Sequence, residues 1–212
     1  MSSYFDFSNQ ENQLENCKIR TYAKTALHSC VVPQILTCSL RTSERKDIVF
    51  AKETVLELLE ITREGTLVSI FEQPVFGTIK DIKVLHCRFS EPSLRVIPGH
   101  DVLVCLSDSG ILSFIAKSGK FLSIKEIKLS EPGFDYKDIG RLVCIDPMGR
   151  YIAVAAWQNL FQLFSLTHDS IFDFDAAEHT NKYLIDGNII LHMTFLYPQD
   201  ESSILLALVV FE

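Results

Sequence analysis

The sequence predicts an all-β protein, organised as an incomplete β-propeller of about four blades that are four-stranded antiparallel sheets. Short apolar runs rich in Val, Ile, Leu and Phe recur from residue 26 onward, with turn-forming residues between them. Hairpin-like segments repeat about every 50 residues, a WD40-like interval typical of propeller blades. Hydrophobic residues make up 47% of the 212 residues and charged residues 22%, which is close to the average for a packed globular protein.

Three segments share the form strand, polar turn, strand, and they predict the central hairpins of three blades. They span Ile48–Ile61, Val102–Ile115 and Tyr151–Phe164, so their starts at 48, 102 and 151 are 54 and 49 residues apart. A fourth, truncated blade is expected at 189–212. Further strands are predicted beside these hairpins, at Leu27–Leu40, Thr66–Glu72, Phe121–Leu129, Arg141–Asp146 and Ile189–Tyr197.

Turn chemistry and composition set the remaining boundaries. Asp146-Pro147-Met148-Gly149 has the residue order of a type I turn. Val55–Glu60 is read as a strand, with a helical turn as the alternative. Asp169–Thr180, acidic and aromatic without period, is read as a loop. Residues 1–24 are expected to be a flexible lead-in, and 25–212 a partial first propeller.

Propeller blades need neighbours, because one twisted sheet cannot bury both of its faces alone. Four repeats do not close a ring of ordinary size. The chain is therefore expected to expose an apolar blade face and unpaired strand edges, unless another segment or a partner covers them.

Charge favours a protein partner over a nucleic acid. The chain carries 20 Lys and Arg against 27 Asp and Glu, a net charge of −7, whereas nonspecific nucleic-acid binding depends on clustered cations. The two basic clusters, Arg41–Lys46 and the lysines 117, 120, 125 and 128, are interpreted as solvated faces or loops.

The sequence shows neither an apolar run long enough to span a membrane nor a secretory signal. The longest apolar run, Ile204–Phe211, is shorter than the roughly 20 residues of a membrane-spanning helix. The first thirty residues contain no apolar core of a secretory signal. We expect a soluble intracellular protein and no membrane partner.

Cysteine and histidine spacing gives no sign of a metal site or a disulfide. None of the cysteines forms a Cys-x-x-Cys pair, so we expect reduced structural thiols, as in the cytosol or nucleus. The histidines lack His-x-His or His-x-x-x-His spacing. The residues concerned are Cys17, Cys30, Cys38, Cys87, Cys105 and Cys144, and His28, His86, His100, His168, His179 and His192.

Motifs for catalysis are also missing. The sequence contains no Gly-x-Ser-x-Gly elbow, and Gly110–Lys120 fails the spacing of a phosphate-binding loop. The acidic pairs Asp135/Asp138 and Asp173/Asp175 could supply an acid and a base, but nothing positions them. No catalytic, cofactor-binding or metal-binding residue is therefore assigned, and no cofactor or small-molecule substrate is expected.

Aromatic residues gather in the third hairpin. A stacking platform for single-stranded nucleic acid would need interleaved basic residues, and none lies between Tyr151 and Leu166. Core packing is the better interpretation of Tyr151, Trp157, Phe161 and Phe164.

Three stretches resemble a known family. Thr25–Glu60 contains Asp-Ile-Val-Phe-Ala-Lys-Glu-Thr-Val-Leu-Glu-Leu, Ile139–Leu166 contains Ile-Asp-Pro and a hairpin with Leu-Phe, and Ile189–Glu212 contains Phe-Leu-Tyr before an aliphatic strand. Together they resemble the N-terminal first propeller of one protein family. Its members include the large subunit of the UV-damaged-DNA-binding complex, the large (A) subunit of the cleavage and polyadenylation specificity factor, and the propeller subunit of splicing factor 3b. Ala155–Gln158 departs from the family's Tyr-Asp or Tyr-Glu turn, which leaves the subfamily open.

The resemblance implies a non-catalytic scaffold without cofactors, located in the nucleus. Family members are several times longer, so the chain resembles a fragment or short isoform. Its implied partners are protein subunits of complexes for mRNA 3′ processing, splicing or DNA-damage-linked ubiquitin ligation, with nucleic acid reached through the complex. The alternatives are direct RNA or DNA binding, and a β-rich enzyme with a site assembled from loops.

Overall fold

The computed structural model describes residues 31–75, 77–86, 100–118, 121–129, 139–157, 159–166, 180–185, 189–197 and 203–211. Within these ranges every regular element is a β-strand, and the strands form three four-stranded sheets and one two-stranded sheet. The all-β prediction is confirmed. Among the described residues there is no helix with the length and apolarity needed to cross a membrane.

Each sheet is an antiparallel meander of strands in chain order. The first contains β1 (Gln34–Cys38), β2 (Asp47–Ala51), β3 (Val55–Ile61) and β4 (Leu67–Pro74). The second contains β5 (Ile79–Leu85), β6 (Val102–Ser107), β7 (Ile111–Ser118) and β8 (Phe121–Lys128). The third contains β9 (Ile139–Ile145), β10 (Tyr151–Trp157), β11 (Leu160–Ser165) and β12 (Thr180–Leu184), and the fourth β13 (Ile189–Leu196) and β14 (Leu205–Phe211).

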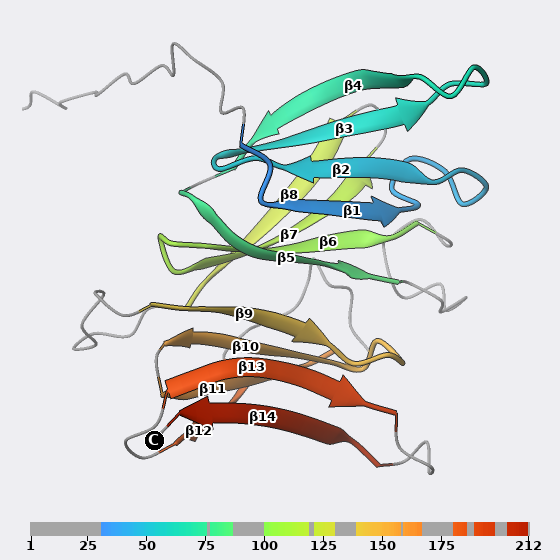
Figure 1. Cartoon of the computed structure of the whole chain (residues 1–212). Helices are drawn as coiled ribbons and strands as arrows, with labels where there is room; N and C mark the ends of the chain where they lie inside the picture. The colour runs from blue at the N-terminus through green and yellow to red at the C-terminus, as the bar shows by residue number, and fades with distance from the viewer. Residues whose placement is uncertain are drawn as a thin grey trace, which may run out of the picture.

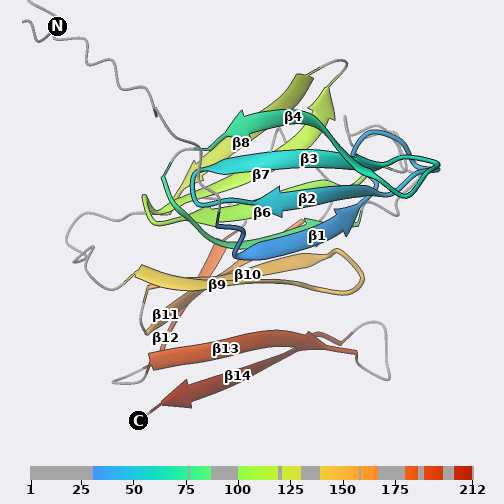
Figure 2. The ribbon, with the colours of Figure 1, turned by 45° about the horizontal axis from the view of Figure 1, so that its top comes forward.

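The sheets follow one another as blades of an open, incomplete propeller (Figure 1). Their first strands, β1, β5, β9 and β13, contact one another in that order. The turned view shows the same succession, with the β13–β14 hairpin at the opposite end from the first sheet (Figure 2). The three predicted central hairpins coincide with β2–β3, β6–β7 and β10–β11, the second and third strands of the first three sheets.

Local sequence explains the strand ends. Val55–Ile61 is a strand, which rejects the helical alternative, because the segment pairs with β2 on one side and β4 on the other. After β9, the Asp146 carbonyl accepts a hydrogen bond of 2.7 Å from the Gly149 amide. Gly149 has a φ of 72°, which favours a residue without a Cβ. The predicted turn there is confirmed.

Three strands differ from the sequence-based predictions. The strand predicted at Leu27–Leu40 is shorter in the structure, since β1 begins at Gln34. No strand was predicted directly before the second hairpin, where β5 begins at Ile79. The sequence did not predict β12, and Thr180, expected at the end of a loop, is its first residue. Four of the five β12 side chains are exposed, so no apolar period marks this outer strand. The rest of the expected loop and the lead-in 1–24 lie outside the described residues.

Three apolar cores lie between successive sheets, and each burial of a large aliphatic or aromatic side chain stabilises the fold by about 1.5–3 kcal/mol. The first joins sheets one and two around Val49, Leu58, Ile82, Leu103 and Ile115. The second joins sheets two and three around Val104, Leu112, Phe114, Val154 and Phe164. The third joins sheets three and four around Ala153, Ala155, Ile190, Met193 and Phe195.

One buried carboxylate connects three blades. Asp81 on β5 is 4% exposed, and its Oδ1 accepts hydrogen bonds from Gln34 Nε2 at 3.1 Å and Lys83 Nζ at 2.9 Å. Its Oδ2 accepts from the Val143 amide of β9 at 2.8 Å. Gln34 makes a second hydrogen bond to β5, because its Oε1 accepts from the Ile82 amide at 3.0 Å. Polar bonds thus hold the first strands of three sheets in one register.

A second buried carboxylate, Asp101, fixes the loop after β1. Its Oδ2 accepts from the Ser39 amide at 2.6 Å, and its own amide donates to the Ser39 carbonyl at 2.9 Å. The Asp101 Oδ1 also lies 3.0 Å from His86 Nδ1. The base of the β1–β2 loop is therefore tied to the second sheet.

Replacing Asp81 tests the inter-blade connection. The amide N–H₂ of Asn cannot accept a hydrogen bond, so Asp81→Asn leaves either the Gln34 and Lys83 donors or the Val143 amide unpaired. The substitution should therefore lower the free energy of unfolding by about 3 kcal/mol. Urea unfolding followed by circular dichroism measures the change. Glu126→Gln, at an exposed position of β8, is the matched control and should change stability by less than about 0.5 kcal/mol. Equal stability of the two variants would contradict the role given to Asp81.

Substitutions at two glycines distinguish the cost of backbone strain from the cost of steric crowding. Gly65 and Gly77 have φ values of 81° and 87°, but an added Cβ meets nothing at Gly65, whereas at Gly77 it lies 2.7 Å from Asp108 Oδ1. That oxygen accepts the Thr78 amide at 2.7 Å. Gly65→Ala should cost about 1 kcal/mol of unfolding free energy, and Gly77→Ala about 1 kcal/mol more, through the displaced hydrogen bond. Thermal unfolding compares them, and an equal loss would argue against the crowding.

Candidate interaction surfaces

The first sheet has one covered and one open face. Leu36 and Cys38 of β1 point toward the second sheet, while Ile35, which precedes Leu36 in the strand, is 60% exposed. Ile61 and Leu67, at the other edge of this open face, are paired across β3 and β4 and are 54% and 45% exposed. The predicted exposed apolar blade face is therefore present on this sheet.

Charges interrupt this first open face. Lys52 Nζ lies 2.8 Å from both Glu57 Oε2 and Glu72 Oε1, so one cation joins two carboxylates across β3 and β4. The hydrogen bond from Lys52, with one from Ser69, outweighs desolvation and lowers the pKa of Glu57. The face is thus a mixed apolar and charged surface.

The β13–β14 hairpin also has one open face, and this one is apolar. Met193 and Phe195 pack on the third sheet, whereas the alternate positions project away from it. No strand among the residues that the structure describes pairs with the second edge of β14. The exposed apolar side chains of this hairpin are Leu191, Leu196, Leu205, Val209, Val210 and Phe211.

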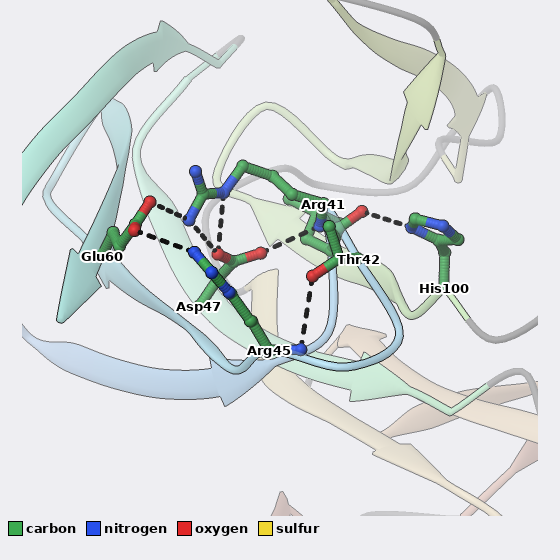
Figure 3. Close-up of polar contacts among 7 residues, drawn as sticks. Arg41, Thr42, Arg45, Asp47, Glu60 and His100 are labelled. Carbon is green, nitrogen blue, oxygen red and sulfur yellow. Dashed lines mark hydrogen bonds and ion pairs between the residues drawn. The ribbon is translucent and has the colours of Figure 1, made fainter. Parts of the chain in front are cut away.

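The β1–β2 loop brings the first predicted basic cluster against two carboxylates (Figure 3). Arg41 Nη2 lies 2.7 Å from Asp47 Oδ1 and 2.8 Å from Glu60 Oε2, and the Arg41 amide donates to Asp47 Oδ2 at 2.9 Å. Asp47 is 1% exposed. Desolvation opposes the charge of Arg41, but the hydrogen bonds to Asp47 and Glu60 outweigh it and raise the pKa of the guanidinium. The solvated interpretation was wrong for Arg41 and holds for the exposed Arg45 and Lys46.

A similar pair closes the turn after β9. Arg150 Nε donates to Asp146 Oδ2 at 2.8 Å, and the Arg150 amide donates to the same oxygen at 3.1 Å. Burial alone would raise the pKa of Asp146, but its bonds to Arg150 lower it. These arginines therefore neutralise buried turn carboxylates.

The lysine cluster is only partly described. Lys128 on β8 is exposed and Lys125 is half-buried. Lys120 lies outside the described residues, as does the side chain of Lys117.

Three cysteines lie in the apolar interior as free thiols. Cys38, Cys105 and Cys144 are buried, and desolvation is the main cause that raises the pKa of each to about 12. A thiol in this state remains protonated at neutral pH and is a poor nucleophile or metal ligand. The structural interpretation is confirmed for these three, and Cys17, Cys30 and Cys87 lie outside the described residues.

Histidines make local contacts. His86 faces Asp101, and His100 donates from Nδ1 to the Leu40 carbonyl at 3.0 Å. His192 is exposed on β13, while His28, His168 and His179 lie outside the described residues. In the described part of the chain, no three His, Cys, Asp or Glu side chains are grouped to hold a metal ion.

The aromatic residues of the third sheet pack as predicted. Trp157 and Phe164 are 4% and 1% exposed in the second core, and Tyr151 and Phe161 pack against the third. Phe161 also stacks on Tyr183 of the unpredicted strand β12, with ring centroids 4.8 Å apart. The carboxylate pairs Asp135/Asp138 and Asp173/Asp175 lie outside the described residues.

The succession of antiparallel sheets with their first strands side by side places the chain in the class of β-propeller proteins. Residues 31–211 match the family described as the RSE1/DDB1/CPSF1 first β-propeller. The chain belongs to this family, in agreement with the resemblance found in the sequence.

Two curated relatives are pre-mRNA-splicing factors named RSE1. The protein from Candida albicans is 30% identical over 135 residues, which cover 62% of this chain and 10% of the relative. The protein from Debaryomyces hansenii is 26% identical over 148 residues, or 68% of this chain and 11% of the relative. The aligned residues thus span about a tenth of the length of these relatives.

A lysine on the open face of the fourth sheet should be tolerated, because Val209 is 54% exposed. Val209→Lys should change the unfolding free energy by less than about 0.5 kcal/mol and reduce the fluorescence of an apolar naphthalenesulfonate dye. Leu208→Lys, one position away on the face that packs on the third sheet, should cost about 2–3 kcal/mol. Equal destabilisation by the two changes would show that the face is covered.

Proposed function

We propose that this chain acts as a non-catalytic propeller scaffold that binds protein subunits of a nuclear complex for pre-mRNA processing. The observation that carries the proposal is the pair of outward faces on the first and fourth sheets, one mixed and one apolar. Exposed apolar surface of this kind is typical of protein–protein contacts. The thiols of Cys38, Cys105 and Cys144 are buried in the apolar interior, and His86 and His100 make local hydrogen bonds, so these groups have structural roles.

The relatives support the type of complex. Both curated relatives carry the name pre-mRNA-splicing factor, and the family groups them with DDB1 and CPSF1 propellers. Splicing takes place in the nucleus, so a nuclear location follows from the proposal. Direct nucleic-acid binding is the less favoured alternative, because the net charge of −7 opposes attraction of a polyanion.

Affinity purification from nuclear extract tests this function. The tagged full chain should enrich identified splicing or 3′-processing proteins, and the enrichment should survive nuclease treatment. The Asp81→Asn variant, with weakened blade contacts, should enrich them less, whereas Glu126→Gln should behave as the parent chain. Enrichment that disappears with nuclease would favour nucleic-acid binding. Enrichment of ubiquitin-ligase subunits instead would overturn the assignment to pre-mRNA processing.

A further inference from the structure

One end of the first sheet carries a hollow of about 580 Å³. The β1–β2 loop and the β3–β4 turn, which lie at the same end of the sheet, form its walls (Figure 1). Four of its seven lining residues are basic, in a chain with a net charge of −7. The lining residues are Arg41, Arg45, Lys46, Glu60, Ile61, Thr62 and Arg63.

The walls of the hollow are held in place. The loop base is fixed by Asp101 at Ser39 and by His100 at Leu40, as described above. Farther along the loop, the Arg45 amide donates to Thr42 Oγ1 at 3.3 Å (Figure 3). In the opposite wall, the Thr62 amide donates to the Thr66 carbonyl at 2.9 Å. The backbone of both walls therefore has little conformational entropy left to lose when a ligand binds.

The cations divide into an inner and an outer set. Arg41 is compensated by Asp47 and Glu60 and is only 24% exposed. The Arg45 side chain is 68% exposed, and Arg45 Nη1 lies 3.6 Å from Glu60 Oε1, a long contact for an ion pair. Lys46 and Arg63 are also exposed. The outer set, Arg45, Lys46 and Arg63, thus carries three positive charges, whereas Glu60 is the one carboxylate that lines the hollow.

We propose that this hollow, named here the basic hollow, binds an acidic peptide segment of a partner protein. The inference rests on the proposed scaffold function and specifies one surface for it. Arginine side chains match carboxylates well, because the planar guanidinium can donate two parallel hydrogen bonds. Ile61, 54% exposed at the rim, offers an apolar contact beside the charges. The segment recognised is therefore acidic with an apolar side chain among its carboxylates.

A peptide fits this surface better than a nucleic acid does. A nucleic-acid strand needs a track of cations along its backbone, together with aromatic platforms for the bases. The basic hollow is confined to one end of one sheet, contains Glu60 and has no aromatic lining residue. A few carboxylates around one apolar residue match its size and charge.

Fluorescence anisotropy with the full 212-residue chain tests the site. The probe is a labelled short peptide with one Leu flanked by Glu residues, and its matched control has Gln in place of Glu. The Glu peptide should bind and weaken with added salt, and the Gln peptide should not bind. The double change Arg45→Glu and Arg63→Glu should weaken binding by about tenfold or more. Lys128→Glu, at an exposed cation of β8, should leave it unchanged.

Other outcomes would overturn the inference. Equal binding by the double variant and the parent chain would place the peptide elsewhere, and tighter binding of oligouridylate would make the hollow a nucleic-acid site. Unfolding curves establish that the double variant is folded, as expected for two exposed positions. If splicing proteins still co-purify but the Glu peptide does not bind, the basic hollow is refuted while the scaffold function stands. Peptide binding without co-purified partners would refute the scaffold function instead.

Discussion

The structure depends on the stacking of one twisted sheet on the next. A four-stranded sheet has two faces, and each apolar core of this chain covers one face from each of two neighbours. The second and third sheets are therefore covered on both sides, whereas the first and fourth are covered on one. The surfaces to which we assign a function lie on those two outer blades, since the interior blades are enclosed by their neighbours.

The sequence contained enough information for the central hairpins, because their strands are buried and their apolar runs are separated by turn residues. β6, for instance, is buried at every position. It contained too little for β12, whose exposed outer strand Thr180–Leu184 has no hydrophobic period. The bulge between Ile79 and Asp81 also breaks strict alternation, so that Ile79 and Ile82, three positions apart, share one core.

The interaction surfaces were harder to predict, because they join residues distant in sequence. An exposed apolar face followed from the incomplete repeat, but its extent required the register of β3 with β4 and of β13 with β14. The Arg41–Lys46 cluster looked like an ordinary solvated loop. Its pairing with Glu60 and its position opposite Arg63 appear only when β3 lies beside β2, and the return of Arg41 onto Asp47 depends on how the loop folds. Charge counts alone carry no such information.

The contacts of Asp81 have a consequence for cooperativity. One carboxylate bonded to groups on β1, β5 and β9 makes the first three sheets a single unfolding unit, because separating any two leaves buried polar groups unpaired. The β13–β14 hairpin joins the third sheet through apolar side chains and a 3.4 Å bond from Arg150 to the Ser203 carbonyl. The molecule therefore contains a large cooperative unit and a smaller one that can open locally, as in repeat proteins with nearest-neighbour energetics.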